Sequence, residues 1–516
     1  MIQNLVIVGG GTAGWMVAAA LCHLFQDGAL KITLIESEAI GTVGVGEASI
    51  PHLRYFNERL GINEHEFMRV TNATFKLGIE FANWRKVGHS YIHPFGEMGF
   101  PTKYGPFYHY WSRAQQLGLN LSADEFSIAT HMARLGRFTY PSKNDSELLS
   151  TFSYAFHLDA ARYALFLRQF CERHFKGFSR IEGKIEHVLR NPDTGDISTL
   201  VMEGGGKIAG DFFIDCSGFR SLLLSQTLGA KPLDMSEYLP ANSAIAVPTD
   251  ETYPDMPYSR ATAHSAGWQW RIPLRHRTGN GIVYSTHFMS DSEAEQQLHQ
   301  NLGGKTLADL NFIRFQARRM NRSWHHNCVG IGLSSGFLEP LESTSIHLIQ
   351  AAIMKWTELL PGGSDWTVER EEFNRQMADE YEKIRDFLVL HYHTTEREDS
   401  EFWRYVKNMP IPDSLEQRIG LMRETGVIET YKHGLFLESS WAYVYFSQGG
   451  KSEALHHRTR YLSDQDLVNN LQRFRDEIAR KANGIEPQSR ILEKISDGSA
   501  VEKWPQSAMS LYGVFS

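Results

Sequence analysis

A short apolar run followed by glycines opens the chain. Residues 5–8 form the kind of β-branched run that makes a strand buried on both faces of a parallel sheet. The alanine-rich residues 14–24 predict a helix, and residues 31–35 form a second apolar run. Strand, helix and strand in this order make one βαβ unit, so the sequence predicts an α/β protein.

Helical periodicity returns later. Residues 157–175 carry apolar side chains at helical spacing on two sides, which predicts a mostly buried helix. These side chains are Leu158, Ala161 and Leu165 on one side and Tyr163, Phe166 and Phe170 on the other. Strand-like runs follow at 184–189 and 212–215, so α/β elements resume after the aromatic, glycine-punctuated residues 51–150, which we expect to line a pocket. Beyond residue 361 two apolar stripes, at 373–388 and 467–478, predict helices.

Composition narrows the class of protein. The 516 residues are 42% hydrophobic and 22% charged, which excludes a disordered or fibrous chain. The net charge is −8 without long basic runs, so neither a nucleic acid nor an anionic membrane is an expected partner. No window approaches the roughly 18 apolar residues of a membrane span, and no basic leader precedes the first strand. We therefore expect a cytoplasmic protein.

Cysteines and paired histidines give no metal signal. The four cysteines lack ligand spacing and indicate buried thiols in a reducing compartment, without disulfides. They are Cys22, Cys171, Cys216 and Cys328. Two histidine pairs, His391 with His393 and His456 with His457, have no cysteine or carboxylate at ligand spacing, so no metal is expected.

The glycine turn after the first strand predicts a dinucleotide site. Gly9, Gly11 and Gly14 fit G-x-G-x-x-G, with a strand before the motif and a helix after it. Such glycines let backbone N–H groups approach a pyrophosphate, and Glu36 at the end of the next strand can accept hydrogen bonds from a ribose. Thr12 and Ala13 complete the turn. The alternative is a glycine turn in an ordinary α/β fold.

Further small-residue segments favour FAD over NAD. Residues 41–51, with Gly46 and Ala48, directly follow the acidic strand, and glycine turns recur at 215–218 and at 332–336, around Leu333. Three separated contact segments suit a long, buried flavin better than a nicotinamide that must enter and leave. We expect residues 1–50, 151–245 and 325–360 to form a discontinuous FAD-binding domain. Residues 51–150, 246–324 and 361–516 would then form the substrate-binding region.

One aromatic motif carries a family resemblance. Trp268, Trp270, Ile272 and Pro273 fit W-x-W-x-I-P, and the segments GVGEASIP and LEST are also present. From Gly9 to at least His347 the chain resembles a flavin-dependent halogenase of the tryptophan-halogenase family. The resemblance implies a flavin monooxygenase type of fold, with inserted segments and a helical C-terminal part. It also implies that the tryptophan motif lies beside the flavin and keeps the organic substrate away from it. The alternative is two tryptophans on one face of a core strand.

The resemblance assigns two catalytic residues. Lys76 matches the lysine that meets hypohalous acid, as a haloamine or by hydrogen bonding; without the family, it would be a surface lysine paired with Glu80. Glu342, in the LEST segment, matches the residue that polarises the halogenating species and takes up the ring proton; alone, it could be a helix N-terminal acid.

Halide and substrate positions follow from the same resemblance. The amides of Thr344 and Ser345 match the halide site, although the family commonly has glycine at position 345. His93 and Phe95 resemble the pair that stacks on an indole ring, with ordinary aromatic core as the alternative. In the family a later segment holds free tryptophan with adjacent tyrosines and an acid. Here residues 438–450 lack the tyrosine doublet, and after Glu438 no acid follows until Glu453, so indole or a relative is the expected substrate.

The resemblance implies a reaction sequence. FADH2 from a separate flavin reductase reacts with O2 to a C4a-hydroperoxide, chloride or bromide attacks it, and hypohalous acid travels through a tunnel to Lys76. Lys76 and Glu342 then direct electrophilic substitution of a small aromatic. A flavin-dependent hydroxylase and a non-catalytic flavin-binding protein are the alternatives, and a homodimer is an open expectation.

Overall fold

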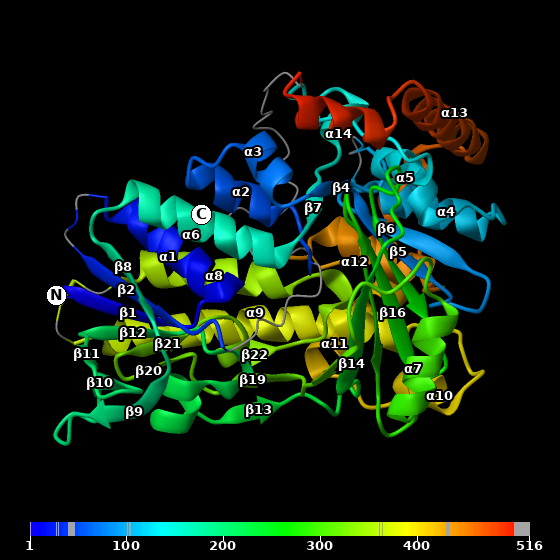
Figure 1. Cartoon of the computed structure of the whole chain (residues 1–516). Coiled ribbons are helices and arrows are strands. Elements are labelled where there is room, and N and C mark those ends of the chain that lie inside the picture. Colours follow the sequence, from blue (N-terminus) through cyan, green and yellow to red (C-terminus); the bar gives the residue numbers. More distant parts are fainter. Residues whose placement is uncertain are drawn as a thin grey trace.

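The computed structural model describes residues 2–26, 28, 30–39, 47–100, 102, 105–360, 362–363, 365–429 and 434–499. A six-stranded sheet with strand order β20-β21-β12-β1-β2-β8 forms one side of the molecule (Figure 1). Its strands are β1 (Asn4–Val8), β2 (Lys31–Glu36), β8 (Phe178–Glu182), β12 (Phe212–Asp215), β20 (Trp324–His325) and β21 (Cys328–Gly330). Strands β12, β1, β2 and β8 are parallel, so three distant stretches of chain build one nucleotide-binding type of sheet.

The apolar run that opens the chain fixes the centre of this sheet. Val6 pairs with Phe213 on one side and with Thr33 on the other, and residues 5–8 are all buried. Helix α1 (Thr12–Leu24) packs against α6 (Ala160–His174) and α8 (Ser345–Glu358) over the sheet. The predicted α/β fold class is confirmed.

A seven-stranded sheet with order β18-β14-β17-β16-β15-β5-β6 forms the other side. Its strands are β5 (Gly78–Ala82), β6 (Ser90–Pro94), β14 (Ser243–Thr249), β15 (Ser259–Ala263), β16 (Gly267–Pro273), β17 (Thr278–Tyr284) and β18 (Asn311–Arg314). All neighbouring strands are antiparallel except β5 and β15. Gly281 on β17 makes room for Trp270 on β16, since a Cβ there would lie 2.1 Å from the indole ring.

Short sheets and helices complete the chain. The three small sheets have the orders β3-β7-β4, β11-β10-β9 and β13-β19-β22. Their strands are β3 (Glu47–Ala48), β4 (Thr74–Lys76), β7 (Ala155–Leu158), β9 (Ile185–Arg190), β10 (Ile197–Met202), β11 (Lys207–Ala209), β13 (Pro232–Asp234), β19 (Arg318–Met320) and β22 (Gly336–Phe337). The remaining α-helices are α2 (His52–Arg59), α3 (Glu64–Val70), α4 (Phe107–Gln116), α5 (Ile128–Arg134), α7 (Asp291–Gln300), α9 (Thr367–His393), α10 (Glu401–Asn408), α11 (Asp413–Thr425), α12 (Glu438–Ser447), α13 (Asp464–Asn483) and α14 (Gln488–Asp497).

The expected start and burial of one helix were wrong. The helix predicted from residue 157 begins at Ala160, because the Asp159 side chain accepts from Arg162 N and caps it, while His157 and Leu158 belong to β7. Its Ala161 and Leu165 side is exposed to the cavity described below rather than buried. Residues 51–150 also hold regular elements, whose shortness explains the weak sequence signal. Among the described residues, no helix is long and apolar enough to cross a membrane.

Candidate active site

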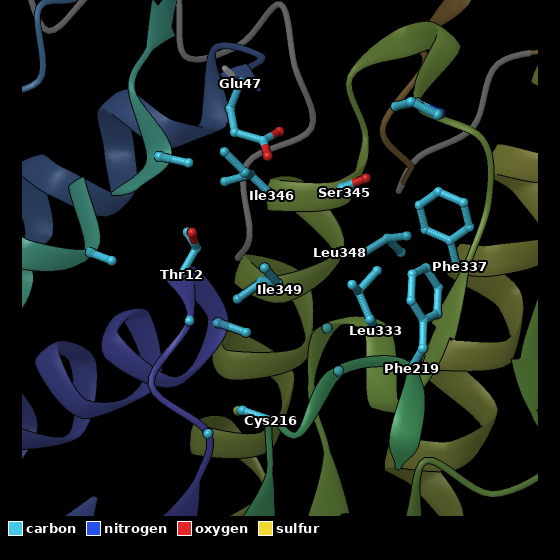
Figure 2. A pocket seen from close by; sticks show the side chains of 18 of the residues that line it. Thr12, Glu47, Cys216, Phe219, Leu333, Phe337, Ser345, Ile346, Leu348 and Ile349 are labelled. Atoms are coloured by element: carbon cyan, nitrogen blue, oxygen red, sulfur yellow. The ribbon is translucent and has the colours of Figure 1, made fainter. Parts of the chain in front are cut away.

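A cavity of about 1030 Å³ runs between the glycine turn after β1, the first turns of α8 and the face of β16. Figure 2 shows its side at Thr12 and at Ser345 to Ile349. Gly9, Gly11, Thr12, Ala13, Glu36, Ala48 and Leu333 line it, as do Trp268, Trp270, Ile272 and Ser345. Of the stretch 51–150, Ile79 is the described residue that reaches its wall. Gly46 lies outside the described residues.

The glycine turn has the shape of a pyrophosphate cradle. Gly9 has a φ of +117°, and a Cβ there would lie 2.2 Å from the carbonyl oxygen of Cys216. A Cβ on Gly14 would lie 1.8 Å from the Gly9 carbonyl oxygen, so this glycine allows close packing instead of lining the cavity. Gly11 is the N-cap residue of α1, so no side chain covers the first helix amides, and a Cβ there would meet nothing within 4 Å. The helix amides therefore face open space, which suits FAD.

Glu36 lies at the cavity wall, held by two arginines that the sequence did not point to. Its carboxylate accepts from Trp15 Nε1 at 3.2 Å and from Arg180 Nε, and Arg168 lies 3.6 Å away. An acid held in place beside the glycine turn, at the end of the second strand, is suited to bind the hydroxyls of a ribose.

The tryptophan motif forms a wall of the cavity. Trp268 and Trp270 project from the same face of β16, with ring centroids 6.2 Å apart. Pro273 does not line the cavity; its carbonyl oxygen accepts from Thr74 Oγ1 at 2.8 Å. This bond ties the end of β16 to β4, the strand that carries Lys76.

Lys76 is fully buried. Its Nζ donates to Ser49 O at 3.0 Å and to Ser343 Oγ at 2.8 Å, and lies 5.2 Å from the Phe95 ring centroid. Burial lowers the pKa of Lys76 to about 7, although Glu342 acts in the opposite direction. The surface-lysine alternative is therefore wrong, and Glu80 pairs with Arg260 instead.

Glu342 is buried between two imidazoles. His93 Nδ1 lies 2.9 and 3.0 Å from the carboxylate oxygens, and His391 Nε2 lies 2.8 Å from Oε1. Burial alone would raise the pKa of Glu342, but His93 and His391 outweigh it and hold the pKa at about 2. The carboxylate is thus ionised throughout the working range of pH. Sequence reasoning missed His391, which it had considered only as a metal ligand.

The start of α8 separates the cavity from the lysine. Ser343, in the left-handed region at φ 60°, lines the cavity and accepts from Lys76. Thr344 caps α8 without a side-chain hydrogen bond, and Ser345 projects to the cavity (Figure 2). Backbone amides at this helix start are suited to hold an anion.

Aromatic rings surround His93. The Phe387 and Phe436 rings stack at 3.9 Å, and their centroids lie 5.6 and 6.3 Å from the His93 ring. No sequence pattern points to Phe436, which precedes α12 and reaches the His93 ring only through tertiary packing. In that segment Trp441 Nε1 donates to Phe436 O and Tyr443 OH to Glu97 O.

Two carboxyl groups near the His93 end of the site were also not predicted as site residues from the sequence. Glu97 accepts from Ser439 Oγ, and Glu438 accepts from Tyr108 OH at 2.7 Å. Burial raises the pKa of both, and Glu97 raises that of Glu438 further. Among the described residues, no group of three side chains has the composition of a metal site.

The fold and site together define an FAD-dependent enzyme of the flavin monooxygenase type, with a buried lysine and carboxylate set apart from the cofactor cavity. Comparison with known proteins specifies the class. The sequence profile described as tryptophan halogenase matches residues 4–464.

Relatives cover most of the chain. It is 38% identical over 471 residues to tryptophan 6-halogenase SttH of Streptomyces toxytricini, covering 84% of this chain and 87% of that protein. The structure of Xcc4156, a flavin-dependent halogenase from Xanthomonas campestris, superposes with a TM-score of 0.91 at 43% identity, covering 96% and 98% of the two chains. BrvH, a flavin-dependent halogenase from Brevundimonas sp. BAL3, has a TM-score of 0.91 at 40% identity, covering 96% and 99%. The chain belongs to the tryptophan halogenase family, and it is an FADH2- and O2-dependent halogenase that uses chloride or bromide and depends on a separate flavin reductase.

Proposed function

We propose that this halogenase acts on indole or an indole-containing molecule, with Lys76 and Glu342 as its catalytic residues. The contact from Lys76 Nζ to Ser343 Oγ carries the proposal. Ser343 lines the cavity, so the lysine lies one residue behind the cavity wall. A small reagent made in the cavity can reach Lys76 past Ser343, whereas the tryptophans of β16 keep the arene out.

Bound reduced FAD supplies hypohalous acid when O2 and halide are present. Gly9, Gly11, Thr12, Ala13, Gly14, Gly46, Ala48 and Leu333 hold the cofactor in this proposal, Glu36 holds its ribose, and the amides of Thr344 and Ser345 hold the halide. The segments 1–50, 151–245 and 325–360 form the FAD-binding domain, and the remainder forms the substrate-binding region.

Lys76 directs the halogen onto the arene, either by donating a hydrogen bond to hypohalous acid or through a haloamine. In the hydrogen-bonded route the carbon–halogen bond forms as the oxygen–halogen bond breaks, and the oxygen takes a proton from Lys76 and leaves as water. In the haloamine route water has already left when the nitrogen took the halogen, and the carbon–halogen bond forms as the nitrogen–halogen bond breaks. Glu342 takes the ring proton, and the electrons of the broken C–H bond restore aromaticity. His93 and Phe95 stack on the ring.

Substrate preference is tested by competition among indole, tryptophan and tryptamine under bromide, with products located by NMR. Indole is expected to react fastest, at its most electron-rich carbon, because the tyrosine hydroxyls of α12 bind backbone oxygens and cannot hold an amino acid. Regiospecific substitution of tryptophan on its benzo ring would contradict this preference. Faster reaction of tryptamine would instead assign Glu97 and Glu438 to an ammonium group.

Halide dependence separates the proposed chemistry from hydroxylation. Product mass should change between chloride and bromide, and a product gaining one oxygen under both would favour a hydroxylase.

We also propose a homodimer, which light scattering on the purified protein tests directly.

A further inference from the structure

The second imidazole at Glu342 lies in a rigid aromatic setting. His391, on α9, is fully buried, with the Phe81 ring stacked on it at 4.5 Å and the Phe387 ring edge-on at 5.4 Å. Its backbone oxygen also accepts from Gln448 Nε2 at 2.9 Å. The imidazole is therefore fixed both at its backbone and around its ring.

Tyr91 determines which nitrogen of His391 carries the proton. The hydroxyl of Tyr91 lies 3.3 Å from His391 Nδ1. Burial raises the pKa of Tyr91 well above its usual value, so the hydroxyl keeps its proton and can donate to Nδ1. Burial also lowers the pKa of His391, although Glu342 opposes this, so the ring is neutral at pH 7. A neutral ring that accepts at Nδ1 carries its proton at Nε2, the nitrogen that lies 2.8 Å from Glu342 Oε1.

We propose that His391, with Tyr91 behind it, is a positioning residue that fixes the Glu342 carboxylate and keeps it ionised for uptake of the ring proton. The charged and titratable groups facing Glu342 are Lys76 from β4, Tyr91 and His93 from β6 and His391 from α9. In this step the ring proton is transferred to a Glu342 oxygen, and His391 does not take it up. The inference rests on the role proposed for Glu342.

The test uses His391→Phe, His391→Gln and Tyr91→Phe, with His393→Phe as the matched control. His393 lies two residues along α9 and therefore points away from the His391 side of the helix. Single-turnover halogenation is measured with indole and with indole deuterated at the reacting carbon, from pH 5 to 9. FAD affinity and thermal unfolding establish that each variant is folded.

His391→Phe is expected to lose about 10- to 100-fold in rate, the worth of one hydrogen bond to a charged group. A primary deuterium isotope effect should appear in this variant, because removal of the ring proton becomes rate-limiting. His391→Gln, which keeps a donor, should recover part of the rate, and Tyr91→Phe should lose less than His391→Phe.

A loss of rate without an isotope effect would overturn the inference, since it would show a purely structural role. The variant Glu342→Gln distinguishes failure of the proposed function from failure of this inference alone. If that variant still halogenates, the proposed function of Glu342 fails, and the inference fails with it. If Glu342→Gln is inactive while the His391 variants show no isotope effect, only the inference fails.

Discussion

Two single residues carry opposite physical demands in this enzyme. Gly11 must have no side chain, because the space beside its Cα is open to the cofactor cavity. Lys76 must have a long cationic side chain in a place where burial disfavours its charge. In the proposed function the first residue serves cofactor binding and the second serves chemistry, and each role can be tested alone.

Gly11→Val should abolish FAD binding without unfolding the protein. Its backbone is extended, at φ −75° and ψ −174°, which valine adopts freely, and its side chain would fill the cradle. Gly206→Val, in the turn after β10, is the control and should bind FAD normally. Fluorescence titration measures the FAD affinity of both variants. Retained FAD affinity in Gly11→Val would contradict the assignment of this turn as the pyrophosphate site.

Lys76→Met should stabilise the protein at low pH more than at high pH. The pKa of Lys76 is about 7 in the folded protein and 10.5 by the ordinary value, so the unfolded chain binds more protons between these limits. The cost of burying the amine is therefore complete below pH 7 and shrinks as the pH rises toward 10. Denaturant unfolding should show the variant's advantage narrowing in that window, and exposed Lys143→Met should show no advantage. A constant difference would contradict the buried charge.

At the scale of elements, the site depends on how α8 begins. The 3₁₀ turn Pro340–Glu342 places the carboxylate, Ser343 turns the chain through the left-handed region, and Thr344 caps the helix. One short connection thus presents the Glu342 carboxylate on one side and open helix amides on the other.

Ser343→Ala and Ser343→Gly separate the backbone contribution from the hydroxyl contribution. Both remove the acceptor for Lys76 and should reduce halogenation to a similar extent. Only alanine keeps the strain at φ 60°, so the glycine variant should be more stable by about 1 kcal/mol. Denaturant unfolding and product formation are measured on the same samples. Equal stability would show that the left-handed turn carries no strain.

Elements with a strong local pattern could be predicted from the sequence. The run at 5–8 and the glycines after it identified β1 and α1, because a buried central strand and a tight turn leave a clear local signature. The helix start at Ala160 could not be predicted, since a strand pairing through β7 removed residues 157–158 from it. His391 and Phe436 were missed because their positions beside His93 and Glu342 arise only from tertiary packing.

On the scale of the whole molecule, two sheets share one interior. The six-stranded sheet supplies the glycine turn, and β16 of the seven-stranded sheet supplies the wall of tryptophans. Lys76, Glu342, His93 and His391 come from β4, the turn before α8, β6 and α9. The cofactor cavity and the groups proposed to react with the arene should therefore be separable, so that a change in one leaves the other working.

The most direct test of this separation compares Lys76→Ala and Glu342→Gln with the wild type in one experiment. Reoxidation of bound reduced flavin is followed by stopped-flow absorbance, free hypohalous acid is captured with a chemical trap, and halogenated indole is quantified in parallel. Both variants should reoxidise flavin at the wild-type rate and release hypohalous acid to the trap, yet form almost no product. Halogenation by Lys76→Ala at near the wild-type rate would contradict the account.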